Sequence, residues 1–370
     1  MFFLTIIFSF YCLLLLFFLY GIIKFKPKKN YPSKDNGISI IIAIRNGEKS
    51  LINTINDLKK QDYKGEMEFI LVDDESTDRT KEIILNIASE DGRFKYYSSL
   101  DGSKDLKNKK RALDVGISNA VYNYLLFTDV DCSIPSAWAS TMCSYFNGGH
   151  DYLVGSSFTK YDKNLNYVSK FQRTDFLLLM IACRALAFFG YPLASSGQNQ
   201  GFTKILYKKV GGFGKINSFI GDDTAFLQYC NKKGAKSCFV DNSKAQITSR
   251  QESKINKLLL QRARWVSDAN KIWKINKRFF IMLISIFGFY LFLPICLLIS
   301  DVNIYLIISM LLFKILLEYL LFLLGAKFFF IKLHFIHFII WEIFYTPYVI
   351  TIGIMSYLIR FFTWKGRRLS

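Results

Sequence analysis

Long apolar runs without charge constrain the fold of this chain most strongly. Residues 2–23 and 279–300 each contain no charged side chain, and each run is long enough to cross the hydrocarbon core of a bilayer as one helix. A segment surrounded by lipid must satisfy its backbone hydrogen bonds internally, and a single run of this length does so as an α-helix. The sequence therefore predicts a membrane protein with helical spans near both ends.

Two further apolar segments follow near the C-terminal end. Residues 304–325 include Lys314 and Glu318, whose four-residue spacing lets them pair on one helical face inside the membrane. Residues 328–362 are long enough for one span and an additional interfacial helix. We therefore predict four spans in total.

The topology of the last segment has two alternatives. Three C-terminal spans would place the basic end, which includes Arg367 and Arg368, on the side opposite to that favoured by the positive-inside rule. A re-entrant or interfacial helix over residues 328–341, followed by two half-spans broken near Pro347, would keep that end in the cytoplasm. The charge rule favours the second arrangement.

Positive charge is concentrated beside the apolar runs. The formal net charge is +19, and the segment 254–278 holds eight basic residues and one acidic residue. Four lysines follow the first run between residues 24 and 29, which predicts that the middle of the chain is cytoplasmic. Basic residues at a membrane surface attract anionic lipid by about 1 kcal/mol each, so we expect membrane lipids and no nucleic acid as partners. No positive residue precedes the first run, which argues against a cleaved signal peptide.

Acidic pairs follow two of the predicted buried strands. Residues 38–44, 67–72, 94–97 and 124–128 form apolar runs separated by helical patterns, which indicates a parallel sheet with right-handed crossovers. Asp73-Asp74 follows the second strand and Asp129-Val130-Asp131 follows the fourth. The carboxyl ends of parallel strands meet at one edge, where open α/β sheets bind ligands. Two solvated turns are the alternative reading.

The pattern at this edge favours a metal and excludes several nucleotide-binding folds. Asp129 and Asp131 repel each other unless a cation compensates, and Mg²⁺ or Mn²⁺ prefers such oxygen ligands. No G-x-G-x-x-G follows the first strand and no Walker A sequence is present, which argues against an oxidoreductase or a P-loop enzyme. Seven cysteines without CxxC spacing and three histidines also make a zinc site unexpected.

A second acidic pair and an apolar helix lie in the later half. Asp222 and Asp223 precede an amphipathic helix, and we expect Asp222 to cap it. Residues 176–189 are very apolar but include Arg184 and are too short to span a bilayer. A core helix is the favoured reading of that segment, with an interfacial helix as the alternative.

Five segments together resemble glycosyltransferase family 2, in the branch of the cellulose, chitin and hyaluronan synthases and, more distantly, ceramide glucosyltransferase. The segments are residues 72–78, 109–113, 128–131, 221–223 and the Gln261-x-x-Arg264-Trp265 motif. The resemblance implies an α/β GT-A domain, Rossmann-like with a mostly parallel sheet, that is cytosolic and flanked by transmembrane α-helices.

The same resemblance assigns the donor site of a UDP-sugar. Asp73 and Asp74 would contact the uridine, since a carboxylate accepts hydrogen bonds well from a base N–H. Lys109 would lie at the diphosphate, with adjacent Lys110 as the alternative. Asp129, which also touches the donor, and Asp131 would bind Mg²⁺ or Mn²⁺, which stabilises the leaving diphosphate.

The acceptor side is implied in the same way. Asp223 matches the general base of the family, although Asp-Asp stands here in place of the commoner Glu-Asp and leaves Asp222 as a second candidate. Gln261, Arg264 and Trp265 would lie at the acceptor and the diphosphate, with the tryptophan stacked on the acceptor sugar. The competing reading is an interfacial helix with a tryptophan anchor.

The sequence thus predicts a metal-dependent, inverting hexosyltransferase, integral to a bacterial-type cell membrane, that serves the cell envelope. It would transfer sugar from a nucleotide-sugar donor to a lipid or glycan acceptor. A processive polysaccharide synthase is the alternative, and a non-catalytic membrane scaffold is a remote one. The expected parts are an N-terminal transmembrane helix (1–23), a basic linker (24–36), a GT-A domain (37–250), the QxxRW and interfacial helices (251–278), a C-terminal transmembrane region (279–362) and a basic tail (363–370).

Overall fold

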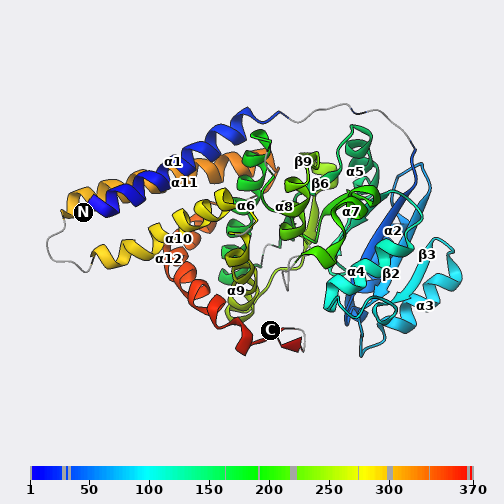
Figure 1. The fold of residues 1–370 in the computed structure, drawn as a ribbon. Helices are drawn as coiled ribbons and strands as arrows, with labels where there is room; N and C mark the ends of the chain where they lie inside the picture. The colour runs from blue at the N-terminus through cyan, green and yellow to red at the C-terminus, as the bar shows by residue number, and fades with distance from the viewer. Residues whose placement is uncertain are drawn as a thin grey trace.

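The computed structural model places an α/β domain at one end of the molecule and long apolar helices at the other (Figure 1). Two helices, α6 (Tyr167–Phe188) and α9 (Ile255–Ile272), lie between these parts. The described residues are 2–26, 31, 35–162, 164–190, 192–216, 223–273, 275–297, 303–332, 334–364 and 367–368.

A seven-stranded sheet in the order β3-β2-β1-β4-β8-β6-β9 forms the centre of the α/β domain. Its strands are β1 (Ile38–Ile44), β2 (Met67–Asp73), β3 (Phe94–Ser98), β4 (Tyr124–Phe127), β6 (Tyr152–Gly155), β8 (Gln200–Thr203) and β9 (Ser237–Val240). All pairs are parallel except those of β8, which runs antiparallel to β4 and β6. The predicted mostly parallel sheet is therefore confirmed.

Helices cover both faces of the sheet, which explains the unbroken apolar sequence of β1. Ile40 and Ile42 point into one core together with residues of α2 (Glu48–Lys59), α3 (Thr80–Glu90) and α5 (Trp138–Asn147). Ile41 points into a second core with residues of α4 (Asn108–Asn119) and α8 (Thr224–Lys232). Alternate side chains of a strand face opposite sides, so a strand buried on both faces must be apolar at nearly every position.

A second, three-stranded sheet adjoins the end of β4. Its order is β5-β10-β7, with β5 (Cys132–Ser133), β10 (Ile247–Ser249) and β7 (Ser157–Thr159). β5 begins directly after the Asp129-Val130-Asp131 segment, and Ser133 pairs with Thr248 of β10. The aspartates are therefore held between two sheets.

Helix α6 connects the α/β domain with the membrane helices and is largely buried, as the favoured reading of its sequence predicts. It packs against α1 (Phe2–Lys24), α11 (Ile304–Phe328) and α12 (Phe335–Tyr357). Arg184 is 2% exposed, and its Nε donates to Asp241 Oδ2 at 2.9 Å. The same guanidinium donates to the carbonyl oxygens of Ile22 and Phe25 at the end of α1. The charged group of Arg184 is therefore hydrogen-bonded, although the segment around it is apolar.

Within the described part of the chain, four helices are long and apolar enough to cross a membrane, as predicted: α1, α10 (Lys277–Leu297), α11 and α12. Figure 1 shows α1 and α11 running side by side away from the sheet. The prediction of two half-spans broken near Pro347 is wrong, because α12 continues through that proline as one helix. A proline inside a helix removes one hydrogen bond, and neighbouring helices compensate for its loss in a membrane bundle.

A buried polar cluster joins the four membrane helices. The predicted pair is present, with Lys314 Nζ 2.9 Å from Glu318 Oε2, and Lys314 also lies 2.6 Å from Glu342 Oε1 of α12. The hydroxyls of Tyr11 on α1 and Tyr290 on α10 donate to Glu318 Oε1. Such contacts stabilise helix association where no water is available to solvate the charges.

Lys314→Met is expected to destabilise the protein, because it leaves the carboxylates of Glu318 and Glu342 without their shared cation. Breaking a buried ion pair by removing one partner costs roughly 3–5 kcal/mol. Thermal unfolding in detergent should show a melting temperature well below that of the natural protein. Lys327→Met, at an exposed position of the same helix, is the control, and equal melting temperatures of the two variants would contradict this account.

Candidate active site

One cavity of about 670 Å³ lies between the α/β domain and the membrane helices. The predicted site residues that line it are Asp74, Lys109, Asp129, Asp131, Asp223, Gln261, Arg264 and Trp265. Asp73 is not among the lining residues, and Asp222 lies outside the described residues. The fold thus brings side chains from all five sequence motifs to a single cavity.

The turn after β2 separates the roles of the first two aspartates. Asp73 pairs in register with Ile44 of β1, and its Oδ1 accepts a hydrogen bond from Ser76 N at 3.1 Å. Asp74 N donates to Ile44 O at 2.7 Å, and the Asp74 side chain reaches the cavity wall. Asp73 therefore shapes the turn, whereas Asp74 faces the cavity.

Arg45 is a cavity residue that sequence reasoning missed. It follows β1, lines the cavity, and donates from Nη1 to Asp74 O at 3.1 Å and to Glu75 O at 3.3 Å. Asn46 Oδ1 accepts from Thr77 N at 2.8 Å and thereby ties the same two loops together. The sequence signal for Arg45 was its position directly after a buried strand, at the edge of the sheet where ligands bind.

Asp129 and Asp131 lie between β4 and β5 on the cavity wall. Lys109 Nζ donates to Asp129 Oδ1 at 2.8 Å, and the two side chains are partly exposed. Thr54 Oγ1 of α2 donates to Val130 O at 2.6 Å, which holds the backbone between the two carboxylates. The ammonium group of Lys109 and the carboxylates of Asp129 and Asp131 therefore share one end of the cavity.

The next residue, Cys132, is structural. Burial, together with the nearby charges of Asp129 and Asp131, raises the pKa of its thiol well above the ordinary value. Cys132 is 5% exposed and is not among the residues that line the cavity, so its thiol does not face a ligand there.

The two carboxylates fit a metal that is shared with a ligand. Among the described residues, no group of three or more His, Cys, Asp or Glu side chains is close enough to hold a metal alone. Mg²⁺ and related ions commonly bind through one or two carboxylates and complete their shell with phosphate oxygens and water. Asp129 and Asp131 match that donor set.

Asp223 caps helix α8, whereas Asp222 was the predicted cap. Its side chain accepts hydrogen bonds from Thr224 N and from Gly197 N, the latter at 3.2 Å. Because α8 begins at Thr224, the carboxylate of the preceding residue is the one that reaches the free amide of the first turn. Asp223 also lines the cavity, so capping orients a side chain that faces it.

The loop Ser195–Gln198 forms another part of the wall that sequence reasoning did not assign. Thr224 Oγ1 donates to Ser195 O at 2.9 Å and accepts from Ser195 N at 3.1 Å. These bonds, with that from Gly197 N to Asp223, attach the loop to the start of α8. The run of small polar residues was the only sign of this loop in the sequence.

The motif Gln261-x-x-Arg264-Trp265 lies on helix α9. Gln261 and Trp265 are four residues apart and so lie on one face of the helix. Trp265 is 37% exposed, and all three motif side chains line the cavity. Arg262, which stands between them, is 3% exposed and contacts Asp175 of α6.

The far part of the cavity lies among apolar side chains of the membrane helices. They include Leu15 and Phe18 of α1, Ile181 of α6, Met282 of α10, Leu321 of α11 and Ile352 of α12. The cavity is therefore polar toward the sheet and mainly apolar toward the membrane.

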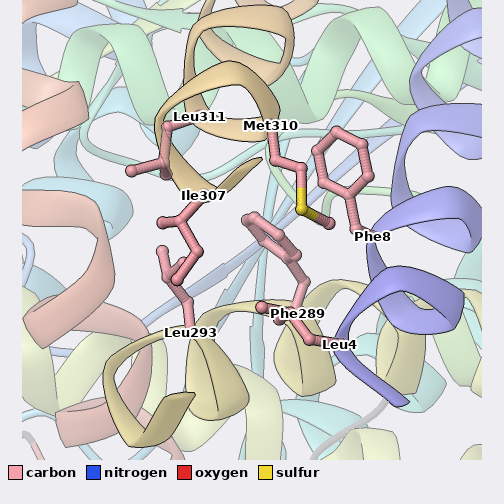
Figure 2. Close-up of a pocket in the computed structure, with 7 residues that line it drawn as sticks. All are labelled: Leu4, Phe8, Phe289, Leu293, Ile307, Met310 and Leu311. Carbon is pink, nitrogen blue, oxygen red and sulfur yellow. The ribbon is translucent and has the colours of Figure 1, made fainter. Parts of the chain in front are cut away.

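A second, much smaller crevice lies between α1, α10 and α11 (Figure 2). Its seven lining side chains, among them Phe8, Phe289 and Met310, are all apolar. Its volume of about 10 Å³ admits little more than one water molecule. It is a packing gap of the helix bundle, without groups that would bind a polar substrate.

The chain matches two models of known families. Residues 39–206 match the glycosyl transferase family 2 profile, and residues 136–363 match glycosyl transferase family group 2. The second match alone covers more than half of the chain. The chain belongs to glycosyltransferase family 2.

Curated relatives of this glycosyltransferase match between a third and two fifths of its length. A GalNAc(5)-diNAcBac-PP-undecaprenol beta-1,3-glucosyltransferase of Campylobacter jejuni is 27% identical over 129 residues, which are 35% of this chain and 40% of that protein. An uncharacterized glycosyltransferase of Haemophilus influenzae is 27% identical over 146 residues, 39% of this chain and 56% of its own length. The match thus spans about half, or less, of these relatives.

A solved structure resembles the glycosyltransferase over almost its whole length. The mannosyltransferase PcManGT from Pyrobaculum calidifontis, solved in complex with GDP-Man and Mn²⁺, superimposes with a TM-score of 0.60. The alignment covers 94% of this chain and 96% of PcManGT at 14% sequence identity. The likeness extends to the fold, and the predicted GT-A architecture with membrane helices is confirmed.

Cys132→Ala is expected to retain nucleotide-sugar turnover within about twofold, because a buried, protonated thiol takes no part in nucleophilic chemistry. The measurement is nucleotide release by the purified variant. A loss as large as that of an Asp131 variant would show that the thiol acts in the reaction.

Proposed function

We propose that this protein transfers a sugar, with inversion, from a UDP-sugar to an acceptor carried on a membrane lipid, using Mg²⁺ or Mn²⁺. The observation that carries the proposal is the single cavity, which joins the motif residues at the sheet edge to an apolar space between the membrane helices. A water-soluble acceptor would not need that apolar extension.

The sheet edge supplies the donor site in this proposal. Asp74 accepts hydrogen bonds from the nucleoside, and its backbone is held by Ile44 and Arg45. Lys109 lies within 2.8 Å of Asp129, where its charge would offset that of a diphosphate. Asp73 contributes through the shape of the turn.

Asp129 and Asp131 would hold the divalent metal together with the diphosphate oxygens. A bound metal supplies positive charge that stabilises the departing nucleotide. PcManGT, which has the same fold, was solved with GDP-Man and Mn²⁺, which supports a nucleotide-sugar donor and a metal for this chain.

Asp223 is the proposed general base. Hydrogen bonds from Thr224 N and Gly197 N orient its carboxylate at the cavity wall. It accepts the proton of the acceptor hydroxyl while that oxygen bonds to the anomeric carbon, and the bond from this carbon to the diphosphate breaks on the opposite face. The anomeric configuration inverts, and Asp222 is the alternative base.

The acceptor would lie along α9 and the membrane helices. Trp265 offers an exposed aromatic face for an acceptor sugar, beside Gln261 and Arg264. The apolar wall suits the chain of a lipid, and the name of the Campylobacter relative describes an undecaprenol-linked acceptor. The catalytic domain would lie in the cytoplasm, which the four lysines between residues 24 and 29 favour under the positive-inside rule.

A processive polysaccharide synthase is the second candidate. The aromatic side chains of Trp341 and Tyr345 on α12 also line the cavity between the membrane helices, as a path for a growing glycan would require. Product length separates the candidates, because single transfer extends the acceptor by one sugar and processive synthesis yields long polymer from donor alone. A non-catalytic scaffold would release no nucleotide at all.

Purified protein is expected to release UDP from one or a few members of a panel of UDP-sugars, and only when Mn²⁺ or Mg²⁺ is present. GDP-mannose belongs in the panel as the donor bound by PcManGT. Addition of EDTA should abolish release, and Mn²⁺ should restore it. Absence of release from every donor would refute the proposed activity, and full release in EDTA would refute the metal.

Asp131→Ala and Asp223→Asn are each expected to lower kcat by about 10²–10⁴-fold, the usual contribution of a general base or of charge stabilisation at the leaving group. Donor binding should weaken in Asp131→Ala and stay near normal in Asp223→Asn. Asp62→Asn is the matched control, because this exposed residue lies in the loop between α2 and β2 and is not a cavity residue. Unchanged kcat in both site variants would rule out the assigned roles.

A further inference from the structure

We infer that Arg262 is a positioning residue that sets the geometry of the acceptor-side motif and connects it to membrane helix α12. The inference rests on the proposed function, because it assumes that Gln261 and Trp265 meet the acceptor. Arg262 stands inside the motif, between Gln261 and Arg264, and its contacts indicate its role.

Arg262 forms a buried ion pair with Asp175 of α6. Its Nε donates to Asp175 Oδ2 at 3.0 Å, and Nη2 lies 2.9 Å from the same oxygen. Tyr348 OH donates to that oxygen as well, at 3.3 Å. Arg262, Asp175 and Tyr348 are 3%, 6% and 7% exposed, so helices α9, α6 and α12 meet at one largely buried carboxylate in the cavity wall.

The same guanidinium contacts two of the three motif side chains. Nη1 donates to Gln261 Oε1 at 3.1 Å, and the guanidinium carbon lies 4.1 Å from the centroid of the Trp265 ring. Phe176 packs beside both, with its ring centroid 5.4 Å from the guanidinium carbon and 6.1 Å from the Trp265 ring. The orientation of the exposed tryptophan face is therefore fixed from its buried side.

Arginine is required for this combination of contacts. A planar guanidinium donates in several directions while its face stacks on an aromatic ring. A lysine at this position keeps the positive charge beside Asp175. Its single ammonium group, however, has neither the several N–H donors nor the planar face of a guanidinium. Arg262→Lys should thus preserve the ion pair and release Gln261 and Trp265.

Arg184 provides a matched control within the same helix layer. It is equally buried and pairs with Asp241 at 2.8 Å. Its other hydrogen bonds reach the carbonyl oxygens of Ile22 and Phe25, and its guanidinium stacks on Phe25 and Phe328. Arg184 therefore has the same chemistry and burial, without contact to the motif.

The experiment compares Arg262→Lys and Arg184→Lys in the full chain, purified in detergent. A polyprenyl-diphosphate-linked disaccharide is the acceptor probe, and nucleotide release without acceptor measures donor turnover. Arg262→Lys is expected to raise the KM for the probe by about tenfold and to leave donor turnover within about twofold. Arg184→Lys should lower the melting temperature to a similar extent and leave that KM unchanged. The inference would be overturned if the KM of Arg262→Lys for the probe equalled that of the natural protein, or if Arg184→Lys raised this KM by the same factor.

A fluorescence measurement tests the geometry without an acceptor. The Trp265 signal is the difference between each protein and its Trp265→Phe derivative, and acrylamide quenching of that signal should increase in Arg262→Lys but not in Arg184→Lys. Failure of the natural protein to release nucleotide would refute the proposed function, whereas unchanged quenching in Arg262→Lys would refute the positioning role.

Tyr348→Phe is the second variant for this test and replaces Arg262→Lys if that variant does not fold. It keeps the aromatic ring and removes only the hydroxyl at Asp175, so the KM for the probe should rise by about two- to threefold. An unchanged KM in that variant would contradict the proposed link between α12 and the motif.

Discussion

The parallel pairing of β1 with β2 and β4 is the interaction on which the rest of the site depends. Ile44 pairs with Asp73 and Ile41 pairs with Phe127, so the chain leaves both neighbouring strands at the same sheet edge. A slip of one residue would exchange the two faces of β1, so that side chains fitted to one core would have to pack in the other. Burial on both faces thus holds the register, and the register holds Asp74, Asp129 and Asp131 at one cavity.

The second constraint is the layer that joins a water-facing domain to a lipid-facing bundle. α6 and α9 each carry a buried arginine, and these form the pairs Arg184–Asp241 and Arg262–Asp175. Burying these ions costs desolvation free energy, and in return each pair fixes the geometry of the helices that it joins. The same layer forms the wall of the cavity, so that the polar donor end and the apolar membrane end meet along α9.

Much of the architecture followed from local patterns. The strands, the acidic residues at their ends, the membrane helices and the Lys314–Glu318 pair all depend on periodicity or short spacing, which a sequence displays directly. The helix cap was displaced by one residue because either aspartate suits the position and the start of α8 decides between them. The partners of Arg262 could not be read from the sequence, since eight basic residues in its segment look alike until their contacts are known.

The sequence by itself determined the family, the order of elements, the helical spans and the candidate acidic groups, because each follows from residue type and near-neighbour spacing. Only the tertiary structure decided that Asp74 rather than Asp73 reaches the cavity, that Asp223 caps α8, and that the cavity continues between the membrane helices. It also decided the partners of Arg262. Asp175 lies 87 residues away from it in the chain, and contacts over such separations depend on how whole helices pack against one another, which no local pattern encodes.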